Sequence, residues 1–265
     1  MRQSPLSPLE KAGSEACFHA SFETMKSLFV TILILSSGCT SNQALKGEVD
    51  AASHGQLRTR GAPASINAAF RKDDLNIDTW TQRFEGESRE VYRAREAIVS
   101  VLGLKRGEVV ADVGAGSGLF LAYLSKAVGE EGEVIAVDIA PVFVEHIRAR
   151  AKAAGLENVR SQLGEQSDVK LKEASVDLIF TCDTYHHFED PDAILKTIRK
   201  ALKPGGRFAV IDYHRIAGKT RPFLMEHVRA GKEVFAAEIE GAGFSPLPSP
   251  ETPFLEENYL MLFER

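Results

Sequence analysis

Short apolar runs alternate with longer amphipathic stretches along most of the chain after residue 105. Short β-branched runs are typical of buried strands, and apolar residues at every third or fourth position are typical of helices. The alternation predicts an α/β fold, in which helices cover both faces of a mostly parallel sheet. We expect strands at 109–113, 132–140, within 158–171, at 176–180, 208–211, from 243 onward and at 258–263, and helices at 119–128, 141–155, 191–202 and 221–243.

The stretch before this region is also amphipathic. Residues 66–75 form either a helix or ordered coil, and residues 78–104 carry an apolar stripe at helical spacing that includes Trp80 and Phe84. Charged residues such as Arg89 and Glu90 occupy the other faces, which predicts a solvated surface there. Trp80 and Phe84 either line a substrate pocket or pack these helices onto the core.

A glycine-rich turn follows the first expected strand. Its pattern is D-x-G-x-G-x-G, from Asp112 through Gly114 and Gly116 to Gly118. A strand, a glycine turn and a helix N-terminus together form a nucleotide pocket at the carboxyl edge of a parallel sheet. The dinucleotide pattern G-x-G-x-x-G would place its third glycine at Leu119, so this turn differs from that pattern.

Polar side chains also end two further strands. Asp138 ends the second strand and is suited to accept hydrogen bonds from ribose hydroxyls, or else to cap the next helix. The strand at 176–180 is followed by Asp183, Tyr185, His186 and His187. A histidine here is suited to act as a general base near neutral pH, or has a structural role. Adjacent histidines rarely converge on one ion, so we expect no metal.

Four signals in order resemble the class I S-adenosylmethionine (SAM)-dependent methyltransferases: the glycine turn, Asp138, the segment 175–191 and the LKPGG turn at 202–206. The resemblance implies a Rossmann-like, seven-stranded sheet whose last two strands form a hairpin with an antiparallel edge. It also implies SAM as cofactor and a helical lid before the domain. The implied cofactor contacts are Asp112, Gly114, Ala115, Gly116, Gly118, Asp138, Ile139, Cys182 and either Glu165 or Asp168, and the candidate catalytic residues are Asp183, Tyr185, His186 and His187.

The charge and the cysteine content of the chain limit the classes of methyl acceptor. The formal net charge is −5, which does not favour nucleic-acid binding. The cysteines Cys17, Cys39 and Cys182 are too far apart for a disulfide framework or a CxxC metal site. We therefore expect a small-molecule or lipid-like acceptor. One alternative is a non-catalytic SAM-binding scaffold lipoprotein. The other is a nicotinamide oxidoreductase, and the glycine spacing and the LKPGG turn argue against this second alternative.

The N-terminal region contains an apolar run at 28–35 after Met25 and Lys26, and small residues then lead to Cys39. The run is too short to span a bilayer but fits a signal peptide. It resembles a bacterial lipoprotein signal, which implies a lipid anchor at Cys39 and a cell-envelope location if translation starts at Met25. Otherwise the protein is cytoplasmic. The expected order is disordered or untranslated 1–24, signal 25–39, flexible linker 40–65, helical lid 66–104 and methyltransferase domain 105–265.

Overall fold

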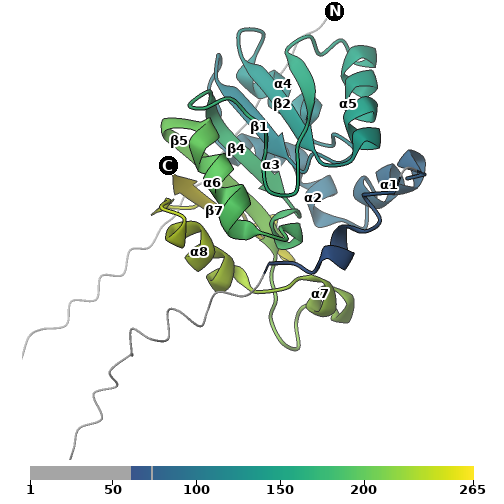
Figure 1. Ribbon diagram of the computed structural model, residues 1–265, viewed down its shortest axis with the longest axis vertical. Coiled ribbons are helices and arrows are strands. Elements are labelled where there is room, and N and C mark those ends of the chain that lie inside the picture. The colour runs from purple at the N-terminus through teal and green to yellow at the C-terminus, as the bar shows by residue number, and fades with distance from the viewer. Residues whose placement is uncertain (1–60, 73) are drawn as a thin grey trace, which may run out of the picture. The chain divides into compact units, whose positions relative to one another are not determined.

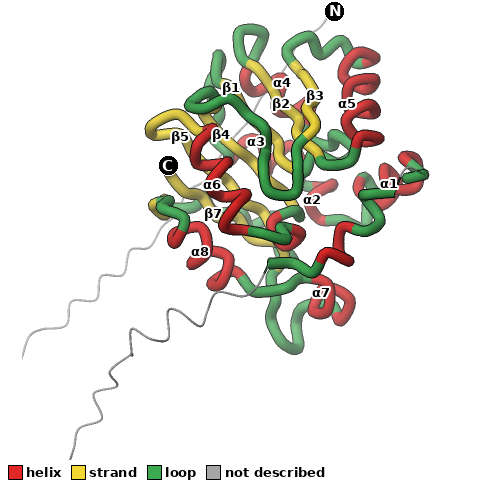
Figure 2. Tube along the Cα trace, in the orientation of Figure 1, coloured by secondary structure: helices red, strands yellow, loops and turns green. Residues whose placement is uncertain are grey.

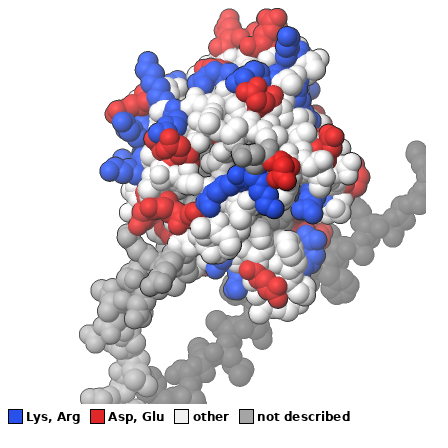
Figure 3. Space-filling model, turned by 45° about the vertical axis from the view of Figure 1, so that its right-hand side comes forward, with Lys and Arg blue, Asp and Glu red and all other residues white. Residues whose placement is uncertain are grey.

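The computed structural model describes residues 61–72 and 74–265. The expected disordered segment 1–24, the signal 25–39 and most of the linker 40–65 lie outside these residues. Within the described part of the chain, no helix combines the length and the apolar character needed to cross a membrane. On the face drawn in Figure 3, acidic and basic side chains are intermixed, and neither sign forms a continuous patch.

The described residues form a seven-stranded sheet in the order β3-β2-β1-β4-β5-β7-β6. The first five strands in this order are parallel, and β7 runs antiparallel to both of its neighbours. This confirms the predicted Rossmann-like fold class. The strands are β1 (Val109–Val113), β2 (Glu133–Asp138), β3 (Val159–Leu163), β4 (Val176–Cys182), β5 (Leu202–Tyr213), β6 (Ser245–Leu247) and β7 (Asn258–Glu264).

Helices cover both faces of the sheet, as Figures 1 and 2 show. Successive strand residues point to opposite faces, so that Val110 packs with one layer and Ala111 with the other. The first layer contains α3 (Arg95–Val101), α4 (Leu121–Val128) and Ile147 of α5 (Pro141–Ala153), and the second contains α6 (Pro191–Ala201) and α8 (Lys232–Gly241).

The lid before the sheet consists of short helices rather than one long one. After a 3-10 turn at Ala64–Asn67, the helices are α1 (Ile77–Phe84), α2 (Glu90–Arg93) and α3. Asn76 caps α1 by accepting a hydrogen bond from the Thr79 N–H at 2.9 Å. A small apolar cluster joins Phe70, Trp80 and Phe84 of the lid to Phe143 of α5.

Three segments differ from expectation. The LKPGG stretch, expected as a turn, lies within β5, which begins at Leu202. The helix expected at 221–243 is divided into α7 (Pro222–His227) and α8, because Val228 takes an extended conformation and Gly231 begins the second helix. At the end of the expected linker, Ala62 is buried and donates its N–H to the Phe188 carbonyl at 2.8 Å. The packed part of the chain therefore includes residues assigned to the linker.

Candidate functional site

A cavity lies at the carboxyl ends of β1, β2 and β4, where the glycine turn meets the lid. This is the position at which open parallel sheets bind ligands. Among the predicted cofactor residues, Asp112, Gly114, Ala115, Gly116, Asp138, Ile139, Glu165, Asp168 and Cys182 line it. Gly118 is not among the lining residues: its φ is +78°, and an added Cβ would lie 2.6 Å from a Leu121 methyl carbon. Its evident role is to make the turn into α4.

Two glycines of the turn line the cavity and leave little room for a side chain. Gly114 has φ +78°, and a Cβ there would lie 2.3 Å from Cγ2 of Thr184 in the loop after β4. Gly116 has φ +53°, and a Cβ would approach the Phe84 ring to 3.1 Å. Both positions favour glycine because the backbone is left-handed, and at Gly114 the Thr184 side chain also excludes a Cβ.

Asp112 offers a buried carboxyl group to the cavity. Its side chain is 2% exposed, and Oδ2 has no hydrogen-bond partner among the described residues. Burial, reinforced by Asp138, raises the pKa of Asp112 from 3.8 to about 7. A buried carboxylate without a partner is costly, so a cationic ligand would stabilise it. The ammonium group of SAM fits this requirement.

Asp138 both lines the cavity and holds the turn in place. Its Oδ2 accepts from the Gly116 N–H at 2.8 Å, and its Oδ1 accepts from the Ala140 N–H at 2.9 Å. Burial raises its pKa to about 6, and these backbone donors oppose the rise. Each carboxylate oxygen can accept a second bond, so the side chain can still receive the two ribose hydroxyls of SAM.

Asp183 lies in a buried network that the sequence did not reveal. It has φ +51°, forms an ion pair with Arg89, and accepts from Asn258 Nδ2 at 2.6 Å. Burial raises the pKa of Asp183, and the Arg89 charge opposes this. The expectation that Arg89 and Glu90 face solvent was wrong, because both side chains turn inward to meet β4 and β7. With both oxygens engaged, Asp183 is suited to position its loop.

Tyr185 lies away from the cavity. It is fully buried, packs against Phe235 of α8, and donates its hydroxyl to Glu238 Oε2 at 3.1 Å. This position favours a core role over the predicted catalytic one. Burial also raises the pKa of the Cys182 thiol, which leaves it neutral at the cavity wall.

The two adjacent histidines are each held at Nδ1. His186 is buried, and its Nδ1 lies 2.8 Å from Asp212 Oδ1 at the end of β5. His187 lines the cavity, and its Nδ1 lies 3.0 Å from Asn67 Oδ1. Burial, with the neighbouring histidines, lowers the pKa of His187 from 6.5 to about 2. A group that so disfavours its proton is poorly suited to act as general base.

A mostly parallel sheet with this strand order, a glycine turn and an acid near the carboxyl end of each of its first two strands defines a class I SAM-binding domain. Residues 104–258 match the family described as a methyltransferase domain. A SAM-dependent methyltransferase from Aquifex aeolicus has a similar structure, with a TM-score of 0.63 and 28% identity over 71% of this chain and 98% of that one.

Two curated relatives are also named as methyltransferases. Protein-L-isoaspartate O-methyltransferase 2 of Archaeoglobus fulgidus is 31% identical over 52% of this chain and 61% of its own length. A ubiquinone/menaquinone biosynthesis C-methyltransferase of Idiomarina loihiensis is 29% identical over 44% of this chain and 47% of its own length. The chain thus spans less than two thirds of either relative. It belongs to the methyltransferase-domain family, and its domain is that of a SAM-dependent methyltransferase, with SAM as cofactor.

Proposed function

We propose that the protein transfers a methyl group from SAM to a small, largely apolar acceptor with a ring that carries a hydroxyl group. The observation that carries this proposal is the wall of the cavity opposite the glycine turn. Phe70, Phe84, Phe143 and Phe188 all line it. Aromatic walls of this kind favour flat apolar ligands, and a few polar groups then fix their orientation.

Polar side chains outside the predicted cofactor contacts also line the cavity. Among them are Thr184 and His187, beside Asp183 with its partner Arg89. When bound, SAM supplies a methyl group activated by a positively charged sulfur. The protein's contribution is to align the acceptor with that group and to exclude water, which Phe84 assists by covering the glycine turn.

The curated relatives are consistent with this chemistry. One is named for ubiquinone/menaquinone biosynthesis, and a Staphylococcus aureus relative that is 26% identical is named demethylmenaquinone methyltransferase. The relative named for isoaspartate methylation acts on protein and represents the competing class. The apolar wall favours the quinone-like class.

The test is a methyl-transfer assay with the full chain, isotopically labelled SAM and two acceptors: a prenylated hydroquinone and an isoaspartyl peptide. We expect a methylated hydroquinone and no methylated peptide. Phe84→Ala should raise KM for the hydroquinone, whereas Leu163→Ala, 49% exposed on β3, should not. Normal binding of S-adenosylhomocysteine without any methylated product would instead support a non-catalytic scaffold.

We also propose that Cys39 carries a lipid anchor, which would bring the enzyme close to a lipid-like acceptor. The support is the sequence from Met25 to Cys39. Labelling of bacterial cells with a fatty-acid analogue should mark the wild-type chain and not Cys39→Ser. Equal labelling of both, or of neither, would refute the anchor.

A further inference from the structure

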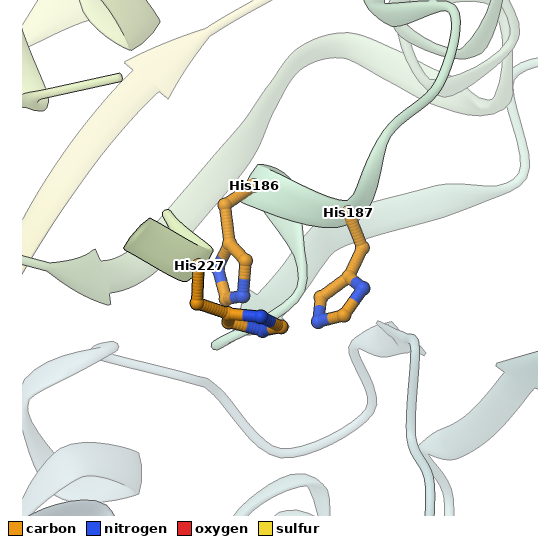
Figure 4. A group of neighbouring side chains, drawn as sticks. All are labelled: His186, His187 and His227. Atoms are coloured by element: carbon orange, nitrogen blue, oxygen red, sulfur yellow. The ribbon is translucent and has the colours of Figure 1, made fainter. Parts of the chain in front are cut away.

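Three histidines meet beside the cofactor cavity. His186 and His187 lie on the 3-10 turn η3 (Tyr185–His187) after β4, and His227 ends α7, forty residues later in the chain. One ring nitrogen from each lies within 4.8 Å of the other two. The ring centroids are 4.3 Å apart for His186 and His187, and 5.0 and 5.1 Å from His227. Figure 4 shows the three rings gathered around one point.

The hydrogen bonds direct the free nitrogens of this cluster. Asp212 engages Nδ1 of His186, and the Asn67 side-chain carbonyl engages Nδ1 of His187. Asn67 is itself fixed, because its amide nitrogen donates to the His187 carbonyl at 3.0 Å and to Glu189 at 2.9 Å. Its oxygen therefore accepts from His187, whose Nε2 keeps a free lone pair.

This pattern is typical of metal-binding histidines, which usually donate their second nitrogen to a carboxylate or carbonyl oxygen. Within the described residues, no hydrogen bond occupies Nε2 of His186 or His187, or either ring nitrogen of His227. Asp212 and Asn67 thus fix the His186 and His187 rings and leave Nε2 of each available to a ligand.

We propose that His186, His187 and His227 form a three-histidine site for a divalent transition-metal ion of the Zn²⁺ type. Imidazole ligands suit Zn²⁺, Co²⁺ and Ni²⁺, and three protein ligands leave one position open in a tetrahedral site. Zn–N bonds of about 2.0–2.1 Å would place the nitrogens about 3.3 Å apart. The nitrogens lie within 4.8 Å of one another, so ion binding would draw the rings closer together. His227 is best placed to move, because it is partly buried at the end of a short helix.

The open position would hold an acceptor oxygen, a role that rests on the proposed function. His187 lines the cofactor cavity, so an ion at this site would adjoin that cavity. A bound metal lowers the pKa of a coordinated hydroxyl group. The hydroxyl would release its proton to solvent and stay on the metal as the anion. The anion would then attack the methyl carbon, and the sulfur would keep the electron pair of the bond that breaks.

The test is a metal titration of the full chain, purified without a histidine tag and treated with a chelator. Co²⁺ is the probe, because its visible absorption reports tetrahedral nitrogen ligands, and Zn²⁺ should displace it. We expect one equivalent of tetrahedral Co²⁺. His227→Ala should weaken binding at least about 10-fold, a lower bound taken from the loss of outer-sphere partners. His214→Ala serves as the matched control, because its ring packs on Tyr259 outside the cluster.

Binding of S-adenosylhomocysteine to the same samples reports the fold and the cofactor site independently. His227→Ala should bind it like the wild type. The proposal is overturned if the wild type gives no tetrahedral Co²⁺ spectrum, or if His227→Ala and His214→Ala bind Co²⁺ equally. Metal binding without methylation of any hydroquinone would leave the metal site standing and refute the proposed function instead.

Discussion

Replacing Asp112 by asparagine should make the protein more stable and a weaker SAM binder at the same time. The carboxylate is buried, one oxygen has no partner among the described residues, and its pKa is raised to about 7. Asparagine has the same shape but no charge to bury. The variant therefore removes a cost from the ligand-free protein, together with the anion that would meet the SAM ammonium group.

The magnitude follows from proton linkage. The folded-state pKa of Asp112 lies above the unfolded value of 3.8, so folding takes up a proton between pH 3.8 and about 7. Stability from this group is full below pH 3.8 and is lost as pH rises through about 7. The shift corresponds to about 4 kcal/mol at pH 8 as an upper figure, and the asparagine advantage should fall below about 2 kcal/mol at pH 5.

The opposite effect concerns the ligand. A hydrogen bond to a charged group contributes about 1.5–3 kcal/mol, so SAM and S-adenosylhomocysteine should each bind about 10- to 150-fold more weakly to Asp112→Asn. Urea denaturation of the ligand-free chain at pH 5 and pH 8, with calorimetric titration of both ligands, measures the two effects. A variant that is less stable than the wild type at pH 8, or that binds both ligands normally, would refute the reasoning.

Three further results are expected. Gly114→Ala should lower the unfolding free energy measured in urea by more than about 2 kcal/mol and abolish SAM binding in calorimetry, because its Cβ would meet a side chain at 2.3 Å. The control Gly155→Ala has φ +65° and nothing within 4 Å, so it should lower the unfolding free energy by only about 1 kcal/mol. Equal losses in the two variants would contradict this reasoning. As pH is raised toward 7 and Asp112 ionises, the SAM affinity of the wild type should increase by up to about 10-fold per pH unit. A SAM affinity that calorimetry finds independent of pH would exclude this coupling. Arg89→Met should destabilise the protein by about 3 kcal/mol at pH 8 and by less at pH 5, because Asp183 stays buried without its cation; urea denaturation with equal losses at both pH values would count against the ion pair.

The sheet and the cofactor turn were predictable from sequence because their signals are local. Asp112 and Gly114 belong to one run of residues whose pattern fixes a strand and a turn. The same reasoning placed Asp138 at the end of the next strand, and the structure brings it to Gly116.

The acceptor side was less predictable because its contacts join distant segments. Arg89 reaches Asp183 across 94 residues, and Asn67 reaches His187 across 120. Neither residue stands out in its own stretch, where arginine is typical of a solvated face and asparagine of a loop. His227 was missed for the same reason, since only the break between α7 and α8 turns that helix end toward η3.

The two halves of the lid are held very differently. In α2, the buried Glu90 accepts from the Asn258 and Glu257 backbone N–H groups at 2.7 and 3.0 Å, whereas α1 has no buried residue. Cofactor exchange should therefore displace α1 more readily than α2. Trp80, the chain's single tryptophan, belongs to α1, and its ring contacts those of Phe70 and Phe84. Its fluorescence should change when α1 moves away. Stopped-flow fluorescence without an added label would therefore measure the rate at which the lid opens.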